Sequence, residues 1–155
     1  MPTSIDVAQA VEDALILVTA DLRKFSITTQ VQHSTAPKIM VVETELAQVL
    51  VNLMINAGQA MPDGGQLTIT TQAEDSEGCP GTVVCLSDTG KGIAKGQIKQ
   101  IFDPFFSTKP GEGTGLGLSI SQALISRAGG FISVRSTEGQ GAEFFVWCPA
   151  ADNLS

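Results

Sequence analysis

Residues 43–61 read ETELAQVLVNLMINAGQAM, and the spacing of apolar and amide side chains in this stretch predicts the structure around it. Apolar residues recur every three or four positions, which is the period of an α-helix with one buried side. They are Leu46, Val49, Leu50, Leu53, Ala57 and Ala60. Amide side chains share a second side of the same helix, at spacings of four, four and three. They are Gln48, Asn52, Asn56 and Gln59.

The amide side of this helix is unusual for a surface that only faces water. Solvated helix surfaces normally carry lysine and glutamate, and asparagine is a mediocre helix former. Two copies one turn apart, Asn52 and Asn56, therefore need another reason. A carboxamide oxygen can bind Mg²⁺ without adding charge that would repel phosphates, and Mg²⁺ takes its other ligands from water and phosphate oxygens.

The remaining hydropathy pattern predicts further elements on both sides of this helix. We expect helices at 6–23 and 114–128, and strands at 26–33, 39–42, 66–73, 82–87, 131–136 and 143–148. Strands that occur in pairs between helices predict an α+β two-layer sandwich, in which helices cover one face of a mixed sheet.

Length and composition restrict the class of protein. At 155 residues we expect one domain, residues 1–155. A net charge of −7 argues against a nucleic-acid surface. We see no signal peptide and no apolar run near the length of about 20 residues that spans a bilayer. Three cysteines without zinc spacing or an even count favour a reducing cytoplasm over a disulfide framework or metal site.

Two glycine-rich motifs flank a long irregular stretch. Residues 88–93 read DTGKGI after a predicted buried strand. There the Asp88 carboxylate can accept a hydrogen bond from an exocyclic amine such as that of adenine, although a simple turn explains this motif alone equally well. Residues 113–118 read GTGLGL and open the last predicted helix. Free backbone N–H groups at such a helix start form an anion site.

Residues 101–109 read IFDPFFSTK and lie between the two glycine motifs. Three phenylalanines in five residues of a glycine-rich loop predict a lid that packs on the core through aromatic anchors. Lys109 can then reach a terminal phosphate.

In their order and spacing these motifs resemble the histidine-kinase branch of the GHKL ATPase and kinase superfamily. Residues 45–57 resemble its N box, 88–92 its first glycine box, 102–106 its F box and 113–118 its second glycine box. Residues 103–109, together with the end of the N box, most resemble the nitrogen-regulation-type sensor kinases. The resemblance implies a mixed sheet of about five strands backed by three helices, with a Gly-rich ATP lid at about 94–114.

The resemblance also implies a set of site residues. Asn56 would bind Mg²⁺, Asp88 would accept the adenine amine, and amides of residues 115–118 would hold phosphates. The full set of expected ATP-binding residues is Asn52, Asn56, Gln59, Asp88, Gly90, Gly92, Ile93, Phe106, Thr108, Lys109, Gly113, Thr114, Gly115, Leu116, Gly117 and Leu118.

The function implied is that of a histidine-kinase catalytic domain, which transfers the γ-phosphate of Mg-ATP to a histidine on a separate dimerisation domain. A response regulator is the downstream partner, and no direct membrane contact is expected. The one histidine, His33, lies in a predicted edge strand and is followed by Ser34. The family's acceptor lies on a helix before an acidic residue, so we expect no autophosphorylation of this chain. We also expect the sensor and dimerisation domains to lie outside residues 1–155.

Two alternatives stay open. The first is a GHKL-type ATP hydrolase, which would place a glutamate general base one turn before the metal-binding asparagine. Asn52 stands at that position and cannot take a proton, which favours transfer to a histidine nucleophile. The second is a pseudokinase module that binds nucleotide without catalysis. This chain also departs from the family pattern at four positions: Gln59 replaces a basic residue, Ala60 an aromatic one, Ala142 a Ser or Thr, and Val42 an Asp that often caps the N-box helix.

Overall fold

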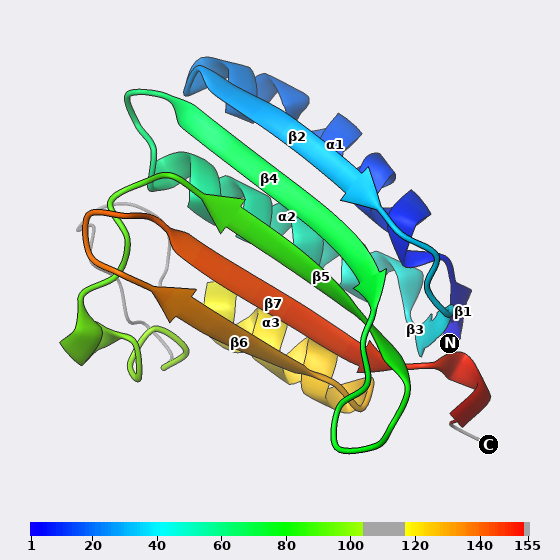
Figure 1. Cartoon of the computed structure of the whole chain (residues 1–155). Coiled ribbons are helices and arrows are strands. Elements are labelled where there is room, and N and C mark those ends of the chain that lie inside the picture. Colours follow the sequence, from blue (N-terminus) through cyan, green and yellow to red (C-terminus); the bar gives the residue numbers. More distant parts are fainter. Residues whose placement is uncertain (104–116, 154–155) are drawn as a thin grey trace.

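The computed structural model describes residues 1–103 and 117–153, and Figure 1 shows helices on one face of a twisted sheet. The helices are α1 (Val7–Lys24), α2 (Glu43–Gln59) and α3 (Gly117–Arg127). The longer strands are β2 (Ile27–His33), β4 (Gly65–Ala73), β5 (Gly81–Asp88), β6 (Phe131–Ser136) and β7 (Ala142–Pro149). Shorter elements are β1 (Thr3–Ile5), β3 (Ile39–Val41) and the 3₁₀ turns η1 (Lys95–Gln97) and η2 (Ala151–Asn153).

The main sheet has five strands in the order β2-β4-β5-β7-β6. Strand β2 runs parallel to β4, and the other neighbours are antiparallel. Because β3 and α2 separate β2 from β4 in sequence, the chain has room to cross over and enter the sheet in the same direction. The predicted α+β sandwich is therefore confirmed, as is the edge position of the strand that carries His33.

Strand β3 lies outside the main sheet, and the sequence did not predict its partner β1. It pairs antiparallel with β1 in a separate two-stranded sheet, where Ser4 lies opposite Met40. The side chains of Ile39 and Val41 are buried at 2% and 4% exposure. Strand β1 has only three residues, two of them polar, which is too short to give an alternating pattern in the sequence.

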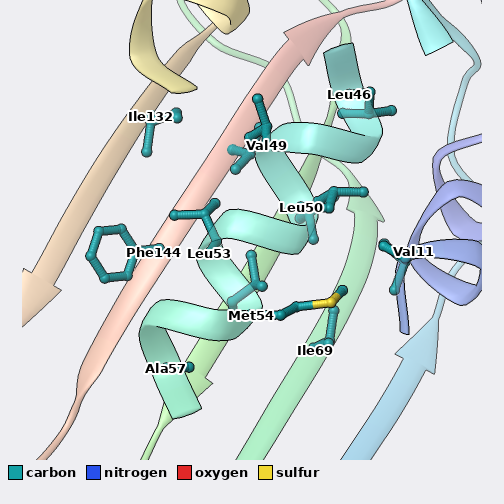
Figure 2. Close-up of a cluster of buried hydrophobic side chains, with 14 of the residues drawn as sticks. Val11, Leu46, Val49, Leu50, Leu53, Met54, Ala57, Ile69, Ile132 and Phe144 are labelled. Atoms are coloured by element: carbon teal, nitrogen blue, oxygen red, sulfur yellow. The ribbon is translucent and has the colours of Figure 1, made fainter. Parts of the chain in front are cut away.

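The apolar side of α2 forms the centre of the core (Figure 2). Leu46, Val49, Leu50, Leu53 and Met54 are each at most 1% exposed. In Figure 2 their side chains point toward neighbours from α1, β4, β6 and β7, namely Val11, Ile69, Ile132 and Phe144. Burying one such side chain contributes about 1.5–3 kcal/mol. This packing fixes the rotation of α2 about its axis and leaves its amide side at the margin of the core.

Helix α3 lies antiparallel beside α2. Arg127 at its C-terminal end contacts Glu45 in the first turn of α2, at 2.5 Å between Nη2 and Oε2. The helix ends within one residue of the predicted end at residue 128, before two glycines: Gly129 has a φ of +87°, and the Gly130 N–H donates to the Ile125 carbonyl. The first turn of α3 consequently faces the C-terminal half of α2, where the asparagines lie.

Candidate functional site

Asp88, the last residue of β5, is a buried carboxylate with one oxygen committed to the backbone. Its side chain is 6% exposed. Oδ1 accepts hydrogen bonds from the Gly90 N–H at 2.9 Å and the Ala142 N–H at 3.2 Å. Among the described residues no other hydrogen bond or ion pair reaches this carboxylate, so Oδ2 is the oxygen placed to accept from a ligand.

Burial controls the ionisation of Asp88. Desolvation raises the pKa of the carboxyl above its ordinary value of 3.8, and the two backbone N–H donors oppose that rise. An acidic group held in this way gains most from a ligand that donates a hydrogen bond to it. An exocyclic amine is such a ligand, which is the role that the sequence predicted for Asp88.

The base loop, which we define as residues 88–93, packs against the end of α2. The Lys91 N–H donates to the carbonyl of Ala60 at 3.2 Å. A Cβ on Gly90 would lie 2.4 Å from the same carbonyl oxygen, so only glycine fits at this close approach. The glycines expected from the sequence therefore allow the loop to touch the backbone of α2.

On its other side the base loop contacts the β6–β7 turn, residues 137–141. The Gly139 N–H donates to the Lys91 carbonyl at 2.6 Å. The Ser136 hydroxyl accepts from the Ile93 N–H and donates to the Gly141 carbonyl, each at 2.8 Å. The base loop is thus held between α2 and this turn.

From the sequence, residue 142 at the end of this turn was noted only as an alanine in place of a Ser or Thr, and the contribution of its backbone was not predicted. Ala142, where a Ser or Thr side chain was expected, contributes its backbone N–H to Asp88 instead. The turn contains the sequence Gly139-Gln140-Gly141, in which two glycines bracket one residue. Both have positive φ, +82° and +91°.

The amide side of α2 connects the base loop to α3. Asn52, Asn56 and Gln59 are half-buried, and Asn52 Nδ2 donates to the Ser121 hydroxyl on α3 at 3.2 Å. From Asn52 to Ala60 the helix rises about 12 Å. This surface therefore runs from the first turns of α3 at one end to the base loop at the other.

The structure brings together those predicted site residues that it describes. Asp88, Gly90, Gly92 and Ile93 form the base loop, Asn52, Asn56 and Gln59 line α2, and Gly117 and Leu118 begin α3 as described. Phe106, Thr108, Lys109, Gly113, Thr114, Gly115 and Leu116 lie outside the described residues, as does most of the expected lid. Before that gap, Phe102 is half-buried and packs on the core.

Neither a metal cluster nor a membrane helix occurs in the described part of the chain. Residues 1–103 and 117–153 contain no group of three His, Cys, Asp or Glu side chains that could hold a metal ion. Within the same ranges, no helix combines the length and the apolar character that crossing a membrane requires.

Comparisons with known proteins agree with this geometry. Residues 41–152 match the family described as histidine kinase-, DNA gyrase B-, and HSP90-like ATPase. The chain is 44% identical over 117 residues to the sensor histidine kinase ZraS of Salmonella typhi, covering 76% of this chain and 24% of that protein. The catalytic domain of histidine kinase ThkA superposes with a TM-score of 0.83 at 29% identity, covering 99% of this chain and 98% of that one.

A third similar protein is ShkA, whose full-length structure is a complex with AMPPNP. It superposes with a TM-score of 0.83 at 29% identity, over 97% of this chain and 31% of that one. The chain belongs to the histidine kinase-, DNA gyrase B- and HSP90-like ATPase family. Within that family it is the catalytic ATP-binding domain of a sensor histidine kinase.

Proposed function

We propose that this domain binds Mg-ATP along the amide side of α2 and transfers the γ-phosphate to a histidine on a separate dimerisation domain. The observation that carries this proposal is Asp88, a buried carboxylate whose Oδ2 is left for a donor while Oδ1 is fixed by two N–H groups. The ShkA complex with AMPPNP supports nucleotide binding in a domain of the same fold.

Each part of the site would recognise one part of ATP. Asp88 accepts the exocyclic amine of adenine, and the backbone of the base loop approaches the flat ring. The amides of α2 face the phosphates without repelling them, because asparagine and glutamine carry no charge. The N-terminal turn of α3, with Gly117 and Leu118, offers free N–H groups to phosphate oxygens.

Asn56 suits a magnesium ion that is bound mainly by the nucleotide. Its side chain is half-buried on α2, one turn before Ala60 and the base loop. A neutral amide oxygen as one protein ligand fits the preference of Mg²⁺ for water and phosphate oxygens as the others. When bound, the ion would neutralise charge on the β- and γ-phosphates.

The nucleophile would come from a partner domain. Position 52 is an amide, and the chain's one histidine lies on edge strand β2, where its Nε2 is 3.3 Å from Glu12 Oε2. An imidazole on another domain needs no general base of this kind, because its own ring nitrogen attacks the γ-phosphate. A response regulator would then receive the phosphate from that histidine.

Phosphate transfer tests this function directly. We expect the chain alone, incubated with γ-labelled ATP and Mg²⁺, to acquire no stable label. Adding the purified histidine-bearing dimerisation domain of a ZraS-type kinase should place acid-labile phosphate on that added domain. Label on this chain that survives in a His33→Ala variant would contradict the assignment of the acceptor to another domain, and ATP hydrolysis without transfer would favour the hydrolase alternative.

Asn56→Ala should remove the contribution of magnesium to nucleotide binding. We expect Mg²⁺ to improve ATP affinity at least about tenfold in the wild type, the effect of about 1.4 kcal/mol, and to have little effect in the variant. Calorimetric titration with and without the metal measures both values. Gln48→Ala is the matched control, because Gln48 lies exposed on the same side of α2 two turns earlier. Equal magnesium dependence in wild type and Asn56→Ala would contradict the role of Asn56.

A further inference from the structure

Helices α2 and α3 are joined by polar contacts at two levels. At one end Arg127 pairs with Glu45 on a largely exposed surface. Nearer the candidate site, Asn52 Nδ2 donates to Ser121 Oγ at 3.2 Å. These two residues are 69 positions apart in the sequence, so only the packing of α3 on α2 brings them together.

The contact with Ser121 lies inside the protein. Ser121 is 2% exposed and is one of only two buried residues of α3, the other being Ile125. A buried hydroxyl that loses its partner retains the cost of having been removed from water. The hydrogen bond from Asn52 therefore satisfies a buried hydroxyl in addition to any role of Asn52 in the candidate site.

The carboxamide of Asn52 also lies against the first described residue of α3. A Cβ built on Gly117 would be 2.6 Å from Asn52 Oδ1 and 2.8 Å from Nδ2. Only a residue without a side chain leaves this space to the amide. Asn52 thus contacts α3 at two residues one helical turn apart, Gly117 and Ser121. These contacts constrain the distance between the first turn of α3 and α2.

We propose that Asn52 is a positioning residue, which holds the first turn of α3 at a fixed place relative to Asn56, and is not itself a nucleotide ligand. This inference rests on the proposed function, because Asn56 and the start of α3 are the groups proposed to meet Mg²⁺ and phosphates. An amide at position 52 donates to the Ser121 hydroxyl, whereas a carboxylate there could only accept from it.

A double-mutant cycle separates positioning from direct contact. The variants are Asn52→Ala, Ser121→Ala and the double variant, titrated with Mg-ATP and with adenosine. If Asn52 acts through Ser121, each single variant weakens Mg-ATP binding by a similar factor, about five- to tenfold for one hydrogen bond. The double variant should then be no weaker than the weaker single variant. Adenosine affinity should stay unchanged in all three, because Asp88 and the base loop are untouched.

Ser126→Ala is the matched control, since Ser126 is exposed on the same helix, and it should bind like the wild type. Two results would overturn the inference. In the first, Ser121→Ala binds Mg-ATP as tightly as the wild type. In the second, Asn52→Ala loses far more Mg-ATP affinity than Ser121→Ala, and the two losses multiply in the double variant. Urea unfolding of the same four proteins reports the Asn52–Ser121 coupling without nucleotide. If the wild type bound no Mg-ATP, the proposed function would be contradicted. If the effects of Asn52→Ala and Ser121→Ala on unfolding were additive, the proposed positioning of α3 by Asn52 would be contradicted.

Discussion

Asp88→Asn is expected to weaken Mg-ATP binding about 100-fold at neutral pH, since a hydrogen bond to a charged group is worth about 1.5–3 kcal/mol. In the variant, the amide oxygen must still face the N–H groups of Gly90 and Ala142. The amide nitrogen then points to where the adenine amine would bind, so two donors meet. Calorimetric titration of both proteins with Mg-ATP measures the difference, and unchanged affinity would contradict the role of Asp88.

The stability of the same variant shows whether lost binding reflects lost folding. Burial raises the pKa of Asp88 above its ordinary 3.8, so the folded state favours the protonated form. This contribution to stability is complete below the unfolded pKa and is lost as pH rises through the folded pKa. Asparagine is neutral throughout. We therefore expect Asp88→Asn to be at least as stable as the wild type at pH 7, with the difference shrinking toward acid pH in urea unfolding.

Gly141→Ala is expected to lower the free energy of unfolding by about 3 kcal/mol or more and to impair nucleotide binding. Gly141 has a φ of +91°, where a side chain is strained. Its added Cβ would lie 2.1 Å from the carbonyl oxygen and 3.1 Å from the carbonyl carbon of Asp88. The backbone must therefore move at Asp88, the residue proposed to bind the base. Urea unfolding and a Mg-ATP titration of the folded variant measure the two effects.

Gly139→Ala is the control for Gly141→Ala, because it shares the turn and the positive φ, +82°, but has open space around its Cβ position. We expect Gly139→Ala to lower the free energy of unfolding only by the backbone strain, about 1–2 kcal/mol, and to change Mg-ATP affinity little. If the two variants lost equal stability and equal affinity, the contact between Gly141 and Asp88 would have no measurable importance.

The sequence by itself determined the main helices and longer strands of this domain and its family. The apolar period of residues 43–61 predicted α2 and its buried side, which the core confirms. The amide period predicted a second surface on the same helix, and the order of the glycine motifs indicated the family before any contact was known. These signals are local, because they depend on residues that lie within a few positions of one another.

Only the tertiary structure decided how distant residues complete the site. Strand β1 and its pairing with β3 gave no pattern, because three residues are too few for one. The Ala142 N–H that donates to Asp88 lies 54 positions away from it in the sequence. The Ser121 hydroxyl that accepts from Asn52 lies 69 positions away from it. A backbone N–H is present at every non-proline residue, so the sequence does not mark the one that folding directs at a carboxylate. That selection is made by the register of the sheet and the packing of α3 on α2.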